Sequence, residues 1–371
     1  MPAHFSALSA RPSSSAETAH GQTPPRSTSG RRWQFPKNPQ LRRLLARSVG
    51  LAAGFLIALA SIAPAFAAHT GYVFVSNERS NTVTVVDPKK EDAIIKQIPT
   101  DLRPRDMQFN ADHSLIYVAC GDSDRIDVID VKKMKVIRHI GTGPSPEMFA
   151  LAPDGKSLYV SEEDSAIVRQ IDIKTDKTLN QITTGPEPEG VLVTKDGSRI
   201  YITSEIADMV HVYDTHAHKL VDNIIVGNRP RRFAMTADHK ELWVSDELSG
   251  EVTVIDPTTD KIKTTLSFLP PGFRPVDVTP VGLALSHDGQ TMYVTLGRAN
   301  HVAFVDAKTK KIEAYVLVGS RAWGIAETAD GSRLYVANGL SDDVSVIDVA
   351  ARKAIGTIPT GRVPHTVLID D

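Results

Sequence analysis

Residues 149–182 read FALAPDGKSLYVSEEDSAIVRQIDIKTDKTLNQI. They contain four short apolar segments, at 149–152, 158–161, 167–171 and 178–182. The turn Pro153-Asp154-Gly155 separates the first two segments, and Asp-Gly pairs suit hairpins because both residues tolerate positive φ. The stretch therefore predicts four short antiparallel strands in succession.

The same unit recurs along the chain. An aromatic residue in its second segment recurs at spacings of 43, 42, 42, 42, 50 and 42, at Phe74, Tyr117, Tyr159, Tyr201, Trp243, Tyr293 and Tyr335. An aspartate that ends its third segment recurs at the same six spacings, at Asp87, Asp130, Asp172, Asp214, Asp256, Asp306 and Asp348. Two markers in lockstep at this period indicate seven structural repeats. We interpret the aspartates as turn-forming residues, not as catalytic groups.

Four antiparallel strands per repeat at this period are typical of a β-propeller blade. Residues 364–371 resemble only the first strand of a repeat, and the first repeat, from Tyr72, lacks that strand. The C-terminal strand can therefore join the N-terminal blade and remove both exposed sheet edges. We predict an all-β, seven-bladed β-propeller over residues 68–371, with an eight-residue excess that forms a surface loop at 268–277.

Residues 1–67 have a different character. Residues 1–40 are rich in Ser, Pro and Arg and are predicted to be disordered. Three arginines then precede an uncharged run, residues 48–68, which contains the small-x-small site Ala65-Phe66-Ala67. This order is typical of a secretory signal peptide cleaved near Ala67, so we expect a periplasmic protein with no stable membrane span. A retained membrane anchor is the alternative, because the run is about long enough to cross a bilayer.

Charge and cysteine content exclude several classes of protein. The whole chain has a formal net charge of −2, but residues 1–67 contain eight Lys/Arg and one Glu, so residues 68–371 carry 34 basic and 43 acidic side chains. That net of −9 argues against nucleic-acid binding, which needs a basic face. Cys120 is the single cysteine, so no internal disulfide or CxxCH haem attachment is possible, and we expect a buried, unreactive thiol.

One position per repeat carries the candidate site. It follows the proline before the innermost strand and is predicted to point toward the mouth of the central channel. The seven residues are Arg105, Glu147, Glu189, Arg231, Val281, Trp323 and His365. Because they differ between blades while the frame is constant, we predict a ligand site formed by the six polar or aromatic members with Arg232. Arginine and histidine there could hold a small anionic ligand, or the two glutamates could pair with the two arginines instead.

Other polar groups are weaker candidates. Acidic loops follow the second strands, as at Glu162–Asp164, Glu205 and Asp246–Glu247, and we expect a solvated acidic rim without the spacing of a calcium site. His211, His216 and His218 include an HxH pair, but the pair falls in a hairpin turn. We therefore assign no metal ligand and no cofactor.

The repeats resemble a known family. Blades with Tyr-Val-Ser/Thr/Ala, then Val-x-Val-Ile-Asp, Gly-x-x-Pro and an Asp-Gly turn are similar to the YVTN β-propeller repeats, and the best matches are residues 252–256 and 344–348. An exported single propeller is most similar to the β-propeller proteins associated with PQQ-dependent alcohol catabolism. That resemblance implies a monomeric, non-catalytic binding or scaffold protein, with a quinoprotein dehydrogenase or a cytochrome as its partner.

Two alternatives remain open. A lactonase-like propeller would use Glu147, Glu189, Arg231 and His365 at the channel mouth, although the lactonases of that group look intracellular whereas this chain is expected to be exported. An envelope adhesion module is the third possibility, although such YVTN arrays tend to be longer and multidomain. A quinoprotein dehydrogenase itself is disfavoured, because the chain has seven blades rather than eight and lacks a vicinal cysteine pair.

Overall fold

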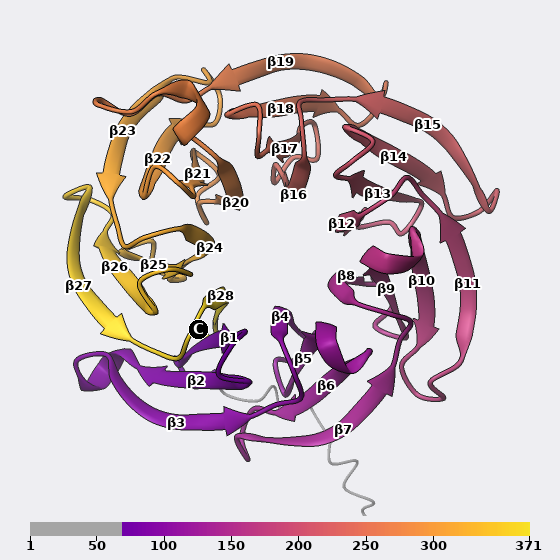
Figure 1. The fold of residues 1–371 in the computed structure, drawn as a ribbon, viewed down its shortest axis with the longest axis horizontal. Helices are drawn as coiled ribbons and strands as arrows, with labels where there is room; N and C mark the ends of the chain where they lie inside the picture. Colours follow the sequence, from indigo (N-terminus) through magenta and orange to yellow (C-terminus); the bar gives the residue numbers. More distant parts are fainter. Residues whose placement is uncertain (1–68) are drawn as a thin grey trace, which may run out of the picture. The chain divides into compact units, whose positions relative to one another are not determined.

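A computed structural model describes residues 69–371, in which seven four-stranded antiparallel sheets surround a central channel (Figure 1). The predicted seven-bladed β-propeller is confirmed. The expected disordered segment and signal peptide lie outside the described residues. Within residues 69–371, no helix combines the length and hydropathy needed to cross a membrane.

Each blade contributes one strand to the channel wall. The seven inner strands, in blade order, are β28 (Pro364–Ile369), β4 (Pro104–Phe109), β8 (Pro146–Leu151), β12 (Pro188–Val193), β16 (Pro230–Met235), β20 (Pro280–Leu285) and β24 (Ala322–Glu327). The second strands are β1 (Val73–Asn77), β5 (Leu115–Cys120), β9 (Ser157–Glu162), β13 (Arg199–Ser204), β17 (Leu242–Asp246), β21 (Thr291–Leu296) and β25 (Arg333–Asn338).

The two outer strands of each blade complete the disc. The third strands are β2 (Thr82–Asp87), β6 (Arg125–Asp130), β10 (Ile167–Asp172), β14 (Met209–Asp214), β18 (Glu251–Asp256), β22 (His301–Asp306) and β26 (Asp343–Asp348). The outermost are β3 (Ala93–Pro99), β7 (Lys135–Gly141), β11 (Thr178–Thr183), β15 (Lys219–Ile225), β19 (Lys261–Ser267), β23 (Ile312–Leu317) and β27 (Lys353–Pro359). Short 3₁₀ turns are η2 (Pro88–Lys90), η3 (Gly121–Ser123), η4 (Glu163–Ser165) and η5 (Pro275–Asp277).

The ring closes where the C-terminal strand joins the first blade. β28 pairs antiparallel with β1, with Val73 opposite Ile369 and Phe74 opposite Leu368. Beyond β28, Asp370 accepts hydrogen bonds from the backbone N–H and the hydroxyl of Thr70, at 2.8 and 2.6 Å. The predicted closure is therefore confirmed, and a buried carboxylate reinforces it.

Hydrophobic packing between neighbouring blades holds the ring together. One cluster joins Phe74 and Val83 of the first blade to Met107 and Ile116 of the second, and all four are buried. The seven repeat aromatics are at most 7% exposed, so the aromatic marker is a core position. The repeat aspartates form turns as predicted: Asp172 Oδ1, for example, accepts the Thr175 N–H at 2.7 Å.

Hydroxyl groups link adjacent blades at the channel wall. Thr295 Oγ1 accepts the N–H of Gly282 in its own blade, at 2.7 Å, and donates to the carbonyl oxygen of Trp323 in the next blade, at 2.8 Å. Equivalent bonds to the next blade come from Ser76, Ser161, Thr203 and Ser245. The Ser or Thr of the repeat motif is thus an inter-blade hydrogen-bonding position, and we call this contact the hydroxyl bridge.

The excess residues between the fifth and sixth blades are only partly a surface loop. Leu269 and Val276 are exposed, as predicted, but Phe268 is 3% exposed and packs into the core with Val278. A Cβ on Gly250 would lie 3.2 Å from the Val278 carbonyl oxygen, so the insertion contacts the turn between β17 and β18.

Candidate functional site

Each of the seven ring residues is the second residue of an inner strand. A register shift in the pairing with the second strand of the blade falls at this point, so the ring residue lies outside the regular strand pairing. Five of them line a cavity of about 350 Å³, which we call the mouth cavity: Arg105, Glu147, Glu189, Arg231 and Trp323. Val281 and His365 are buried but do not line it.

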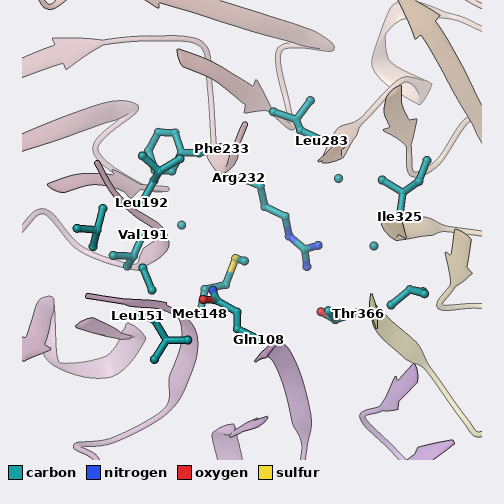
Figure 2. A pocket seen from close by; sticks show the side chains of 16 residues that line it. Gln108, Met148, Leu151, Val191, Leu192, Arg232, Phe233, Leu283, Ile325 and Thr366 are labelled. Atoms are coloured by element: carbon teal, nitrogen blue, oxygen red, sulfur yellow. The ribbon is translucent and has the colours of Figure 1, made fainter. Parts of the chain in front are cut away.

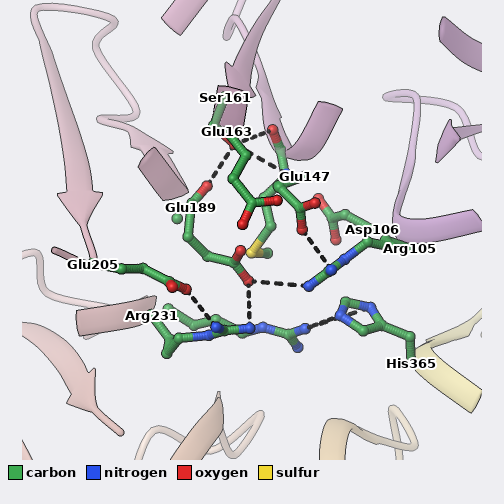
Figure 3. A network of polar contacts seen from close by, with 12 residues as sticks. Arg105, Asp106, Glu147, Ser161, Glu163, Glu189, Glu205, Arg231 and His365 are labelled. Atoms are coloured by element: carbon green, nitrogen blue, oxygen red, sulfur yellow. Dashed lines mark hydrogen bonds and ion pairs between the residues drawn. The ribbon is translucent and has the colours of Figure 1, made fainter. Parts of the chain in front are cut away.

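Arginines and glutamates from neighbouring blades pair inside the mouth cavity (Figure 3). Arg105 Nη1 lies 2.7 Å from Glu147 Oε2, and its Nη2 lies 3.7 Å from Glu189 Oε1. Arg231 Nη2 lies 3.2 Å from the same Glu189 oxygen, and its Nη1 donates to Glu205. The pairing that we predicted as the alternative to an anion site is therefore present, while ligand binding itself stays a prediction.

A second layer of ion pairs surrounds the first. Arg229 lies 2.7 Å from Glu205 and 3.2 Å from Glu247, and Arg321 lies 2.8 Å from Glu247. Glu205 and Glu247 are at most 4% exposed, and Glu162 and Asp246 are fully buried. The prediction of a solvated acidic rim is wrong at these positions, because Glu162, Glu205 and Glu247 turn inward onto arginines and Asp246 accepts a hydrogen bond from the Thr253 hydroxyl at 2.6 Å.

Two adjacent carboxyl groups in the cavity have opposite pKa shifts. Burial raises the pKa of Glu147 well above its usual range, and the field of Arg105 only partly opposes this. Burial also acts on Glu189, but Arg231 and Arg105 on either side outweigh it and lower the pKa. The environment thus favours the protonated form of Glu147 and the ionised form of Glu189.

Burial shifts two further acids. It raises the pKa of Glu205 to about 8, against the attraction of Arg231, and that of Asp106 to about 6. The pKa of Arg105 is raised, because burial is outweighed by the nearby carboxylates, of which Glu147 contributes most. Asp106 follows a ring residue and Glu205 contacts one, so these shifts lie at or beside the ring, and perturbed pKa values are common at functional sites.

Trp323 is the aromatic member of the ring and is surrounded by arginines. The guanidinium carbons of Arg321, Arg231 and Arg232 lie 5.0, 5.2 and 6.0 Å from the indole centroid. Its ring centroid also lies 5.3 Å from that of His365. Trp323 thus lines the mouth cavity and presents a cation–π surface at the position where two other blades place Glu147 and Glu189.

Arg232 and His365 belong to a deeper layer. Arg232 Nη2 lies 2.9 Å from His365 Nε2. Burial, followed by the positive field of Arg232, lowers the pKa of His365 well below its usual value, so the imidazole is neutral. Arg232 lines a second cavity of about 370 Å³, which we call the channel cavity (Figure 2). None of the seven ring residues lines it. The structure thus divides the predicted site between two cavities.

Other candidates from the sequence are accounted for by internal contacts. Cys120 is fully buried, as expected, and burial raises its thiol pKa. His211 accepts the Gly185 N–H at its Nε2 and contacts Asn223 through Nδ1, so both ring nitrogens are engaged. His216 follows in the turn that Asp214 caps, and the backbone N–H of His216 donates to that carboxylate at 2.9 Å.

The fold also assembles a histidine and aspartate cluster that the sequence analysis did not identify. His69 Nδ1 and His113 Nδ1 lie 3.0 and 3.1 Å from Asp370 Oδ1. His69 and His113 precede Asp370 by 301 and 257 positions, so no local spacing in the sequence could indicate the cluster. Asp370 is the shared acceptor, which explains the arrangement without a metal ion.

Comparisons with known proteins agree with this architecture. Residues 90–239 match the family model described as YNCE-like beta-propeller, and residues 194–369 match the one described as Lactonase, 7-bladed beta-propeller. The chain is a β-propeller. A comparison of its sequence with curated proteins gives no significant match.

Solved structures share the fold of this propeller at low sequence identity. The periplasmic gluconolactonase PpgL of Pseudomonas aeruginosa is 19% identical with a TM-score of 0.69, and the match covers 81% of this chain and 99% of that one. The Kuenenia stuttgartiensis hydrazine synthase chain is 21% identical with a TM-score of 0.68, covering 76% and 93%. A functionally unknown protein of Desulfotomaculum acetoxidans is 14% identical with a TM-score of 0.68, covering 81% and 99%. Such identities establish the fold alone.

Proposed function

We propose that the mouth cavity hydrolyses a neutral, hydroxyl-rich cyclic ester, that is, a sugar-type lactone. The observation that carries this proposal is the pair of opposite pKa shifts on Glu147 and Glu189, which Arg105 bridges. Two titratable groups whose environments separate their pKa values are the arrangement that general acid–base catalysis requires.

The roles follow from the protonation states. Glu189, ionised, accepts a proton from the water that attacks the lactone carbonyl carbon. Arg105 and Arg231 stabilise the negative charge that develops on the carbonyl oxygen. Glu147, protonated, donates to the ring oxygen as the carbon–oxygen bond breaks, and a hydroxy acid leaves. The proton taken by Glu189 balances the one given by Glu147, so proton exchange with water restores both groups.

The ion pairs already present in the cavity favour a neutral substrate. Its lining contains five carboxyl groups and five guanidinium groups: Glu78, Glu147, Glu163, Glu189, Glu247, Arg105, Arg229, Arg231, Arg298 and Arg321. A small anion would compete with carboxylates already within 4 Å of Arg105 and Arg231. Glu147 Oε2 and Glu189 Oε1 are buried and lie 2.7 Å from Arg105 Nη1 and 3.2 Å from Arg231 Nη2. Each carboxylate oxygen keeps a further lone pair, to which a hydroxyl group of a polyol can donate.

The comparisons support this class of substrate and remove one argument against it. The C-terminal half matches a lactonase propeller model, and a structural neighbour is titled a periplasmic gluconolactonase. A lactonase propeller can therefore work outside the cytoplasm, where we propose that this chain is exported after cleavage near Ala67. Cleavage there retains His69, which contacts Asp370 in the closed ring.

The test is a hydrolysis assay with glucono-1,5-lactone, read as proton release above the spontaneous rate. Glu147→Gln is the informative variant, because glutamine preserves the neutral side chain but cannot donate a proton. We expect kcat to fall about 10²–10⁴-fold. Glu313→Gln, which removes an exposed ion pair with Arg352 on the disc rim, is the matched control. No acceleration by the wild type, or an undiminished rate in Glu147→Gln, would overturn the proposal.

A second candidate function is non-catalytic binding of a protein partner, as the resemblance to PQQ-associated propellers implies. Three large apolar side chains favour it: Ile206, Leu248 and Leu340 are 61%, 52% and 74% exposed in equivalent loops beside the channel mouth. Exposed apolar groups gathered on one face are typical of interaction surfaces.

The tagged protein, incubated with periplasmic extract from alcohol-grown cells, tests this second candidate. We expect a quinoprotein dehydrogenase or its cytochrome to be retained by the wild type and lost when all three residues are replaced by serine. Retention that does not depend on these residues, or no retention of either protein, would reject this role.

A further inference from the structure

The channel cavity is lined by one charged side chain, two neutral polar side chains and several apolar ones. Figure 2 shows the guanidinium of Arg232 extending into it, with Gln108, Met148 and Thr366 nearby. The remaining wall is mostly aliphatic or aromatic, from Leu151, Val191, Leu192, Phe233, Leu283 and Ile325. At about 370 Å³, the cavity is within the size range of sites for small organic ligands.

Arg232 differs from the other arginines buried in the channel. Arg105 and Arg231 each have carboxylates within 4 Å, whereas Arg232 forms no ion pair with any carboxylate in the described part of the chain. It is 8% exposed, and its contact at 2.9 Å is with the neutral imidazole of His365. Asp106 and Glu189 act on it only from beyond ion-pair distance. A buried guanidinium without a paired carboxylate is costly unless an anion compensates it.

The strand position that holds Arg232 is glycine in three other blades. At Gly190, Gly282 and Gly324 a Cβ would lie 2.1–2.4 Å from a carbonyl oxygen of the next blade. These glycines permit close contact between inner strands and leave no side chain to compete with Arg232 for the lumen. The guanidinium is therefore the principal charged donor presented to this cavity.

We propose that the channel cavity binds an aliphatic monocarboxylate. Its carboxylate pairs with Arg232 in a forked contact, and its hydrocarbon chain lies along the apolar walls. The lining extends to Leu151 and Val193, the last residues of β8 and β12, which are partly exposed. The ligand thus enters from the face opposite the mouth cavity. This site is separate from the proposed lactone site and does not depend on it.

Calorimetric titration of the purified protein with linear carboxylates from butyrate to octanoate tests the proposal. Each added methylene is expected to strengthen binding about fourfold until the cavity is filled. The matching primary alcohols, which lack the charge, are expected to bind at least tenfold more weakly. Equal affinities for octanoate and 1-octanol, or no dependence on chain length, would overturn the proposal with the wild type alone.

Two variants distinguish the contribution of the Arg232 charge to binding from that of the apolar lining. Arg232→Gln is expected to weaken octanoate binding at least tenfold, whereas Arg362→Gln, at an exposed arginine, leaves it unchanged. Ile325→Phe shortens the cavity and is expected to weaken octanoate more than butyrate. If Arg232→Gln does not fold, the Ile325→Phe comparison and the alcohol series still decide the question. Unchanged octanoate affinity in both variants would place the ligand elsewhere.

Discussion

Arg231 Nη2 lies 3.2 Å from Glu189 Oε1, and the two residues occupy the same strand position in consecutive blades. One repeat separates them, so the propeller symmetry itself places the pair side by side. Arg105, two blades before Glu189, reaches the same oxygen at 3.7 Å from across the channel mouth. Glu189 is therefore the carboxylate on which two buried positive charges depend.

That dependence predicts a difference between two chemically identical substitutions. Glu189→Gln removes an ionised group and leaves Arg105 and Arg231 without their shared partner, so we expect a loss of about 3–5 kcal/mol of unfolding free energy. Glu147→Gln replaces a group whose raised pKa favours its neutral form, so we expect a smaller loss, below about 1 kcal/mol. Urea unfolding of both variants measures the difference, and equal losses would contradict the assigned protonation states.

Much of the fold could be predicted from the sequence because each blade repeats the same physical solution. The period of the buried aromatics, such as Tyr159 and Tyr201, determines the number of blades. The missing first strand before Tyr72 and the extra strand from Pro364 predict closure. The aromatic pattern appears seven times, so one irregular blade does not obscure it.

The site was only partly predictable. The ring positions could be found because they share one offset in the repeat, which brought Arg105, Glu147, Glu189 and Arg231 together. Glu205 and Glu247 could not, because acidic loop residues read as solvated when their guanidinium partners are not visible. The sequence did contain one indication. Arg229 and Arg321 each lie two residues before a ring residue, and in the structure they pair with Glu205 and Glu247.

The raised carboxyl pKa values predict how stability varies with pH. Glu205 has a pKa of about 8 in the folded state and about 4.5 unfolded, so between these values the native state binds more protons. The contribution of Glu205 to the unfolding free energy therefore falls as pH rises from about 4.5 to about 8. His365 has the opposite effect, because its pKa is lowered in the folded state. Below the ordinary histidine pKa the unfolded state binds more protons, so the contribution of His365 to the unfolding free energy rises with pH there.

Glu205→Gln isolates the carboxyl contribution, because it removes that titration and leaves His365 in place. We expect the melting temperature of the variant to fall less than that of the wild type as pH rises from 5 to 8, as measured by thermal scans at matched ionic strength. Parallel curves for the two proteins over this range would show that Glu205 is ionised throughout it.

The hydroxyl bridge predicts where the ring is weakened by a small change. Thr295→Ala leaves the Gly282 N–H and one acceptor site of the Trp323 carbonyl without this buried partner, so we expect a loss of about 1–3 kcal/mol. Thr295→Ser preserves the hydroxyl and is expected to recover most of that loss. Denaturant unfolding of the two variants distinguishes hydrogen bonding from packing, because a packing effect of the methyl group would weaken both.

A single carboxylate reinforces the closure of the ring at its seam. Asp370 accepts from Thr70 and contacts His69 and His113, and although burial opposes ionisation, these hydrogen bonds hold its pKa below the usual range. Asp370→Asn removes the charge that strengthens all of these contacts, so we expect a loss of about 1.5–3 kcal/mol at pH 7. Because the folded pKa is lowered, the difference from wild type should shrink as pH falls through and below about 4.

Asp154→Asn, in an exposed turn of the third blade, is the matched control and is expected to change stability by less than about 0.5 kcal/mol. Amide exchange in β1 and β28 gives the more specific readout. If Asp370 secures the seam, Asp370→Asn increases exchange in these two strands before any other blade responds, since they alone join the two ends of the ring. Uniform acceleration in all seven blades would instead mean that closure rests on the strand pairing and the core, with Asp370 contributing no local protection.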